Sequence, residues 1–261
     1  MRKVLICGAL AGALVLAVAG IAYAVNTYTV DPASTTPKGA GSKKKSTAKK
    51  VEFGFKAQDS SGGRASPIKK YKINFQGIKY FGKNFKKCKI SDANGNDHAT
   101  KCKKAKVGEG VVHNLAGQPN DIRPQSQVKC NLKLTVYNLG KGFALRLDGG
   151  PGVVVDGSDC PLAVGQAINA PFKKVKLGGI KSASLQFDVP SNLRHNVGLD
   201  VSVSSVSSTI SSKKRKVKIG KKKRKVSVLS SVACKGKHRD ISVDFTDETN
   251  NTVTATKTID C

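Results

Sequence analysis

Apolar residues stand at every second position in short runs along this chain, and this period restricts its fold more than any other feature. The clearest runs are Tyr71, Ile73 and Phe75; Leu132, Leu134 and Val136; and Leu185, Phe187 and Val189. A period of two buries one face of a β-strand. We find no twelve-residue segment that repeats its apolar residues at the 3.6-residue period of an amphipathic helix. The sequence therefore predicts an all-β protein.

Glycine-rich turns separate these runs and favour antiparallel pairing. The best hairpin pattern joins 132–138 to 143–147 through Gly140, Lys141 and Gly142. Many short strands with such turns are typical of an antiparallel β-sandwich or barrel. We expect one large sandwich over 51–261, and two small sandwiches divided near 165–171 are the alternative.

The first 24 residues have the pattern of a secretory signal peptide. Arg2 and Lys3 precede the apolar run 4–20, and Ala22 and Ala24 supply the small residues of a cleavage site. We expect cleavage near Ala24 and a location outside the cell or in the cell envelope. Retention as a membrane anchor is the alternative, although the apolar run is short for a segment that spans a bilayer.

Residues 25–50 have the composition of a flexible linker. After a brief apolar run over 25–30, the segment is nearly all Pro, Ser, Thr, Gly, Ala and Lys. Such a composition buries too little apolar surface to order itself. We therefore expect a disordered, lysine-rich tether in front of the folded domain.

The chain is strongly basic, with 46 Lys and Arg against 17 Asp and Glu and a net charge of +29. Loss of Arg2 and Lys3 with the signal removes two charges and leaves +27. A chain with this charge attracts anionic polymers or surfaces at low salt with little selectivity. The alternative is a lysine-rich surface that serves solubility alone.

The densest charge lies between 213 and 225 and predicts a basic hairpin. Lys214, Lys216 and Lys218 share one strand face, Arg215, Val217 and Ile219 share the other, and Gly220 begins a turn. Like charges opposite each other across two strands destabilise the pair by about 0.2–1 kcal/mol, so a polyanion lying along this hairpin would stabilise it. The candidate anion-binding residues are Lys213, Lys214, Arg215, Lys216, Lys218, Lys221, Lys222, Lys223, Arg224 and Lys225. The segment 43–50 is a second candidate contact.

Six cysteines follow the signal, and an even number in an exported chain predicts three disulfides. Fifteen pairings are possible, and we expect the nearest neighbours to pair: Cys88 with Cys102, Cys130 with Cys160, and Cys234 with Cys261. The first bond would close a loop of about fifteen residues, worth about 3 kcal/mol in the chain-entropy model. Within this loop Asn94 and Gly95 predict a hairpin.

No complete catalytic or metal-binding motif is present. Asp92, Asn94 and Asn96 begin like a calcium loop, but Asp97 and Lys103 stand where the loop requires Gly and Glu. There is no Cys-x-x-Cys pair for zinc, no Gly-x-Ser-x-Gly, no His-Glu-x-x-His and no P-loop. We therefore expect a protein without enzymatic activity, metal or cofactor. A secreted hydrolase remains an alternative, which Asp or His residues converging in a cleft would favour.

The segment from Phe85 to Gly110 places an aromatic residue before Lys-Lys-Cys, then an Asp/Asn turn, Lys-Cys and Lys-Val-Gly-Glu-Gly. This order resembles a pattern in uncharacterised secreted β-rich proteins of high-GC Gram-positive bacteria. The resemblance covers about a tenth of the chain. It implies a cell-surface β protein and carries no known activity or site residues.

Together these features predict a secreted or cell-surface protein that associates electrostatically with an anionic polymer or surface. The expected partners are an anionic cell-envelope polymer, phospholipid headgroups or extracellular nucleic acid. A sandwich that binds a specific protein partner, with lysines only for solubility, is the alternative of a different class. Salt dependence separates these two hypotheses.

Overall fold

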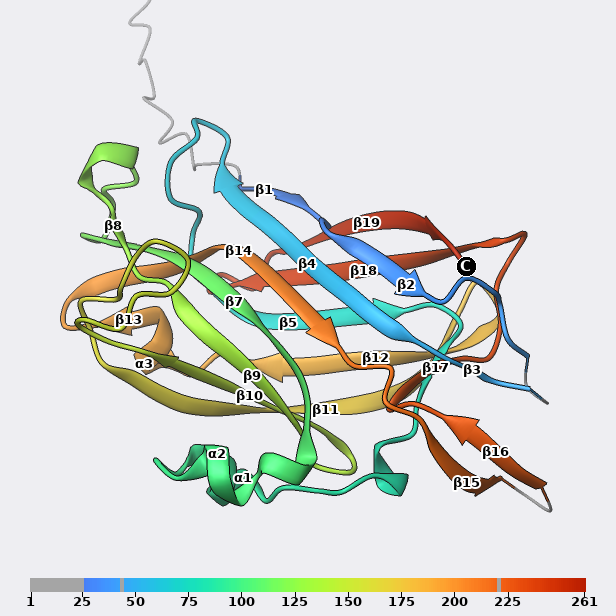
Figure 1. The fold of residues 1–261 in the computed structure, drawn as a ribbon. Coiled ribbons are helices and arrows are strands. Elements are labelled where there is room, and N and C mark those ends of the chain that lie inside the picture. Colours follow the sequence, from blue (N-terminus) through green and yellow to red (C-terminus); the bar gives the residue numbers. More distant parts are fainter. Residues whose placement is uncertain (1–25, 43–44, 220–221) are drawn as a thin grey trace, which may run out of the picture.

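A computed structural model describes residues 26–42, 45–219 and 222–261 (Figure 1). The predicted signal peptide, 1–24, lies outside these ranges. Within them, no helix combines the length and the apolar character that crossing a membrane requires.

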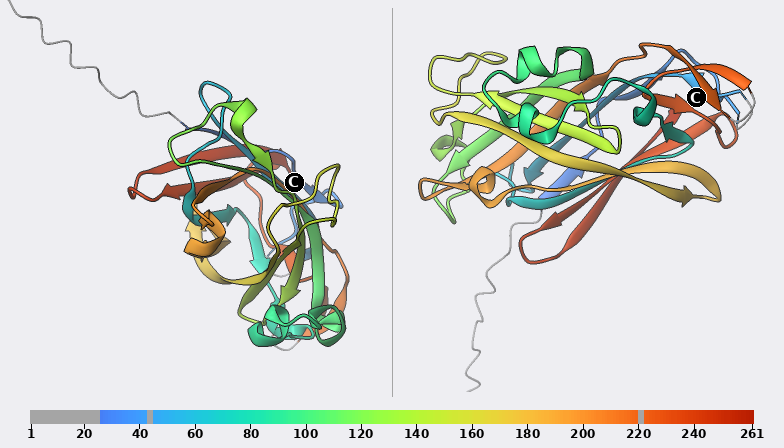
Figure 2. Two further views of the ribbon diagram at one scale, coloured as in Figure 1. Left: turned by 90° about the vertical axis from the view of Figure 1, so that its left-hand side faces the viewer. Right: turned by 90° about the horizontal axis from the view of Figure 1, so that it is seen from below.

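Most strands form one antiparallel sheet that curls until its two edges approach each other (Figures 1 and 2). The strand order is β1-β4-β14-β7-β9-β10-β11-β12-β5-β18-β19, with β2 and β8 paired beside β4 and β7 and β13 paired with β14. The strands are β1 (Asn26–Thr29), β2 (Ala33–Thr36), β4 (Lys50–Asp59), β5 (Ile68–Phe75), β7 (Lys106–Gly117), β8 (Val128–Lys129), β9 (Leu132–Asn138), β10 (Gly142–Gly149), β11 (Val164–Leu177), β12 (Ile180–Asp188), β13 (His195–Asn196), β14 (Leu199–Ile210), β18 (His238–Asp247) and β19 (Thr252–Asp260). The predicted all-β antiparallel class is confirmed.

Two small sheets and six short helices complete the described chain. One small sheet pairs β15 (Arg215–Ile219) with β16 (Lys222–Val226), and the other joins β3 (Thr47–Ala48), β17 (Leu229–Ser231) and β6 (Ile78–Tyr80). The helices are α1 (Ile90–Asn94), α2 (His98–Lys101), α3 (Ser191–Arg194) and the 3-10 turns η1 (Gly82–Asn84), η2 (Lys103–Ala105) and η3 (Pro124–Ser126).

Strand β11 belongs to both halves of the curled sheet, the half from β1 to β10 and the half from β12 to β19. Its first part, from Val164 to Pro171, pairs with β10, and its second part, from Phe172 to Leu177, pairs with β12. The region 165–171, where a division into two sandwiches was the alternative, is thus continuous strand. One hydrophobic core takes residues from both halves, among them Phe53, Leu134 and Val243.

The prediction of a disordered linker over 25–50 is wrong where this segment forms strands β1, β2 and β3. Strand β1 pairs with β4 from Asn26 opposite Asp59, and β2 pairs with the other end of β4. The brief apolar run supplies the reason, because Tyr28 stacks on Phe245 with ring centroids 4.2 Å apart and Val30 is buried. The composition of this segment predicts disorder, but the edge of β4 offers unpaired backbone N–H and C=O groups with which β1 and β2 form hydrogen bonds.

This N-terminal segment also brings the two sheet edges together. Lys257 on β19 forms an ion pair with Asp31, with 2.6 Å between Nζ and Oδ1, and Gly39 donates its N–H to the carbonyl of Cys261. The sheet is therefore nearly closed around its core.

The three predicted disulfides are confirmed: Cys88–Cys102, Cys130–Cys160 and Cys234–Cys261. Disulfides persist in oxidising surroundings, so these bonds indicate such an environment for the folded chain. The hairpin expected at Asn94 and Gly95 is wrong, since α1 and α2 fill that loop. The residues flanking this turn do not alternate, and the side chain of Asn94 instead accepts a hydrogen bond from the Ala167 N–H, 2.8 Å away. This contact fixes α1 against β11.

Candidate functional site

The basic hairpin predicted from the sequence is present as strands β15 and β16, which project from one end of the molecule (Figure 1). The register places Lys216 opposite Lys225 and Lys218 opposite Lys223. Alternate residues of a strand point to opposite faces, so these four side chains share one face, which we call the lysine face. All four are exposed.

The opposite face of the hairpin is anchored to the body of the protein. Val217 and Val226 are buried and form a small cluster with Phe81, while Phe85 packs against it. Arg215 donates from Nη1 to the carbonyl oxygen of Asn84 at 2.6 Å. This packing fixes which face points outward.

The other predicted anion-binding residues that the structure describes lie ahead of β15 or within the two strands of the hairpin. Lys213 and Lys214 are exposed ahead of β15, and Lys222 stands in β16 opposite Ile219. Arg224 lies opposite Val217 and so belongs to the anchored face. Lys221 lies outside the described residues.

The second predicted contact, 43–50, is wrong for Lys49. Lys49 is fully buried and donates from Nζ to the carbonyls of Pro37 and Cys261. Burial, with a smaller effect of the charge on Arg239, lowers the pKa of Lys49 to about 8. Lys50 forms an ion pair with Glu52. Lys45 is exposed, whereas Lys43 and Lys44 lie outside the described residues.

A groove of about 740 Å³ lies beside the hairpin and extends its positive surface. Its apolar lining includes Ile78, Phe81 and Val175. The basic residues that line it are Lys79, Lys174, Lys176, Lys181 and Arg224, and none of its described lining residues is acidic. We call this feature the basic groove.

Sequence reasoning missed the lysines of the basic groove, although a signal for two of them was present. Gly178 and Gly179 form the turn between β11 and β12, and this turn pairs Lys176 with Lys181. Extending the strand alternation across those glycines would have shown a second like-charged pair. The sequence around Lys79 carries no such signal, because only the fold brings β6 beside the turn between β11 and β12.

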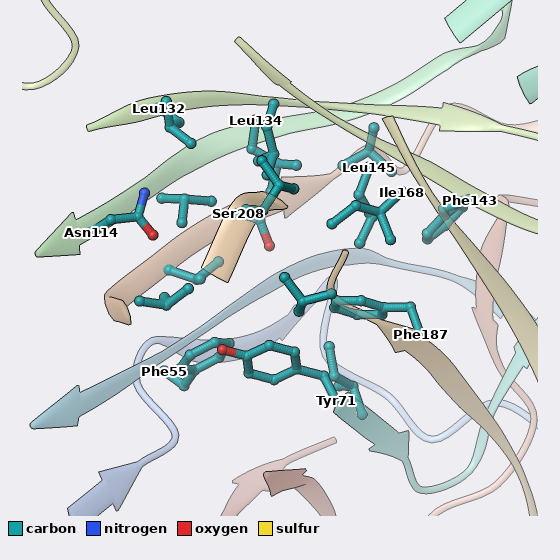
Figure 3. Close-up of a pocket in the computed structure, with 18 of the residues that line it drawn as sticks. Phe55, Tyr71, Asn114, Leu132, Leu134, Phe143, Leu145, Ile168, Phe187 and Ser208 are labelled. Carbon is teal, nitrogen blue, oxygen red and sulfur yellow. The ribbon is translucent and has the colours of Figure 1, made fainter. Parts of the chain in front are cut away.

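An apolar cavity of about 140 Å³ runs between the two halves of the curled sheet (Figure 3). Its labelled lining residues come from eight strands and include Leu134, Leu145 and Ile168 on one side and Phe55, Tyr71 and Phe187 on the other. The sequence reasoning assigned such residues to the core and predicted no cavity among them.

A β-bulge in β14 keeps one wall of this cavity apolar. The pairing register between β14 and β7 shifts between Val203 and Ser205. Because a bulge adds one residue to the strand, it changes which alternate positions face inward. Val201 and Val203 line the cavity before the bulge, and Val206 and Ile210 line it after.

The cavity is closed at one end and partly open at the other. Val51, Ile210 and Leu229 at the hairpin end are buried, whereas Leu147, Val164 and Leu193 near α3 are half-buried. We call this second end the mouth. The polar residues Asn192 and Asn196 of α3 and β13 also line the cavity there. In Figure 1, α3 and the basic hairpin lie at opposite ends of the molecule.

A third constellation joins a serine, a histidine and an aspartate on the outer surface. His113 on β7 stands directly opposite Ser205 on β14. The distance from its Nδ1 to Ser205 Oγ is 2.8 Å, and the distance from its Nε2 to Asp156 Oδ2 is also 2.8 Å. A pocket of about 320 Å³ that Lys129 also lines lies beside them. The sequence reasoning missed this group, since the three residues are far apart and match no spacing motif.

Within the described ranges, no group of three or more His, Cys, Asp or Glu side chains is arranged to hold a metal ion. A comparison with protein-family models found no match, and a comparison with curated proteins found none either.

Proposed function

We propose that this protein is exported and binds anionic polymers or surfaces through the lysine face and the basic groove. The observation that carries this proposal is the lysine face. In the described chain none of Lys216, Lys218, Lys223 and Lys225 is paired with a carboxylate, and the register sets them against each other in two like-charged pairs. Charges held together without counter-ions bind a polyanion favourably, because binding releases the polymer's own counter-ions.

The basic groove supports the same function. Its lysines continue the positive surface from the hairpin to the tip of β11 and β12. A flexible polyanion that follows the hairpin would therefore meet further cations in the groove. Lysine is a point charge that sets no planar pairing geometry, so we expect selectivity for charge density over sequence or sugar identity.

Retention on heparin resin tests the proposal. The test variant replaces the four lysines of the lysine face with glutamine. The matched control replaces four other exposed lysines that form no ion pair in the described chain, Lys86, Lys89, Lys103 and Lys104, with glutamine. Both variants lose the same net charge, so a local site predicts that only the test variant elutes at much lower salt. Equal shifts in the two variants would show that overall charge alone governs binding and would contradict the site.

A secreted hydrolase is the second candidate function, and the geometry of Ser205, His113 and Asp156 favours it. When Nε2–H of His113 donates to Asp156, Nδ1 accepts the hydroxyl proton of Ser205, which is the polarity of a nucleophile, base and carboxylate. In ester hydrolysis, Ser205 Oγ would bond to the carbonyl carbon while its proton passes to His113. The leaving alkoxide would take that proton, and water would then release the acyl group by the same two transfers.

A fluorophosphonate probe, which labels activated serines covalently, tests this second function. The hydrolase hypothesis predicts labelling of the wild type, loss of labelling in Ser205→Ala, and full labelling in the control Ser207→Ala, whose serine is exposed nearby on the same strand. Absence of label on the wild type, or label that survives Ser205→Ala, would exclude Ser205 as the nucleophile.

A further inference from the structure

We propose that the apolar cavity is a binding site for a small uncharged molecule of one ring or about six carbons that carries a single hydroxyl or carbonyl oxygen. This site differs from the surfaces described above in place and in chemistry. It lies inside the sheet, and none of the described residues that line it is charged.

The volume of the cavity sets the size of the ligand. At about 140 Å³ it is close to the engineered cavity of about 150 Å³, lined by Leu, Ile and Phe, that stays dry and binds benzene. The chemistry of the wall is similar, because Leu134, Leu145 and Ile168 face Phe55 and Phe187 (Figure 3). An apolar void of this size lacks contacts that a ligand can restore.

Tyr71 supplies the polar element of the site. It lines the cavity and is only 3% exposed, yet its hydroxyl has no hydrogen-bond partner within the described part of the chain. The hydroxyl is not among the fully enclosed polar atoms that lack a partner, so it borders open space and can donate to a ligand oxygen. A ligand oxygen that reaches this hydroxyl would supply its missing hydrogen-bond acceptor. Burial also raises the pKa of Tyr71, so the group stays a neutral donor.

The mouth gives such a ligand a route into the cavity. Leu147, Val164 and Leu193 are half-buried at this end, and Asn192 and Asn196 provide a polar rim. The opposite end is sealed by buried Val51 and Leu229. Entry at the mouth leaves the basic hairpin untouched, since the two features lie at opposite ends of the molecule (Figure 1).

Calorimetric titration with benzene and phenol, at low and at high salt, tests the proposal. We expect both probes to bind with affinities that salt does not change, and phenol to bind about five- to tenfold tighter through one added hydrogen bond. Tyr71→Phe keeps the ring and removes the hydroxyl, so phenol should bind this variant more weakly than benzene, because the phenol hydroxyl would then be buried without a partner.

A substitution that fills the cavity provides a second test of the proposal. Val206→Phe places a ring in the cavity and should abolish binding of both probes. The matched control Ser207→Phe adds the same ring at the next residue of β14, which is exposed, and should leave binding unchanged. Circular dichroism and urea unfolding would confirm that each variant is folded.

Several outcomes would overturn the inference. If neither probe binds the folded wild type at millimolar concentration, the cavity is not a binding site. Binding that persists in folded Val206→Phe would place the probes elsewhere. Equal affinities of benzene and phenol for the wild type would remove the role assigned to Tyr71. None of these results bears on the heparin experiment, so the two proposals fail separately.

Discussion

The basic hairpin and the interior cavity differ in how their strands direct side chains: the hairpin alternates regularly, whereas the cavity wall contains a β-bulge. In the hairpin, one face packs on Phe81 and the other carries four exposed lysines. In β14, a bulge turns valines on both sides of it toward the cavity. The alternation of residues in the sequence predicts the lysine face directly. The cavity wall depends on the β-bulge between Val203 and Ser205, which the alternation does not predict. Simple strand periodicity in the sequence therefore predicts charged surfaces better than it predicts interior cavities.

The largest expected effect comes from the disulfide Cys130–Cys160, whose cysteines line the cavity. The bond spans a sequence separation of 30 residues, so replacing both cysteines with alanine should lower the free energy of unfolding by about 4 kcal/mol in the chain-entropy model. Urea denaturation measures this loss. The hairpin does not contain this bond, so the salt needed to elute the folded variant from heparin should stay the same. A large drop in that salt concentration would show that the two regions are coupled.

The second effect contrasts a buried lysine with the exposed ones. The pKa of Lys49 is about 8 in the folded protein against 10.5 normally. Between these values the unfolded chain holds a proton that the folded chain has lost, so the free energy of unfolding should rise with pH. The rise from pH 8 to pH 10.5 should reach at most about 3 kcal/mol. Urea denaturation across this range measures it.

Lys49→Met should remove most of this rise, because the titrating group is gone. The matched control Lys216→Met changes an exposed lysine of the lysine face and should keep it. An equal rise in wild type and Lys49→Met would refute the assignment to Lys49.

The smallest effect concerns repulsion within the lysine face. Lys218→Glu would place opposite charges at the pair with Lys223, and we expect a gain in stability of about 0.5 kcal/mol. The same change should weaken retention on heparin. Lys104→Glu makes an equal change in charge at an exposed helical site and should give no comparable gain. Thermal unfolding of the three proteins decides whether cross-strand repulsion is present.

Much of the fold could be predicted from local pattern. Strand alternation at 132–138 and 143–147 predicted the hairpin of β9 and β10, and the assumption that neighbouring cysteines pair predicted all three disulfides. These features succeed because their partners are close in sequence. The order of Asn26–Thr29 could not be predicted, since it depends on an edge of β4 that the segment itself does not encode.

The candidate sites also divide into those formed by residues close in sequence and those formed by residues far apart. The lysine face was foreseen because a single turn sets its register. The basic groove, the cavity around Tyr71 and the pairing of His113 with Ser205 all depend on strands that lie far apart in sequence. The composition of 25–50 predicted an exposed Lys49, but this lysine is buried. Nothing in a run of lysines shows which one the fold buries.

The most direct test of two separate binding sites is one salt titration of the wild-type protein with two ligands, a random-sequence DNA duplex and phenol. We predict that DNA affinity falls steeply with salt, with a log–log slope of about −4 if only the four lysines of the lysine face contact phosphates. We predict that phenol affinity stays constant over the same range, because none of the described residues that line the cavity is charged. DNA binding that is insensitive to salt, or phenol binding that weakens in parallel with it, would contradict two separate sites of opposite chemistry.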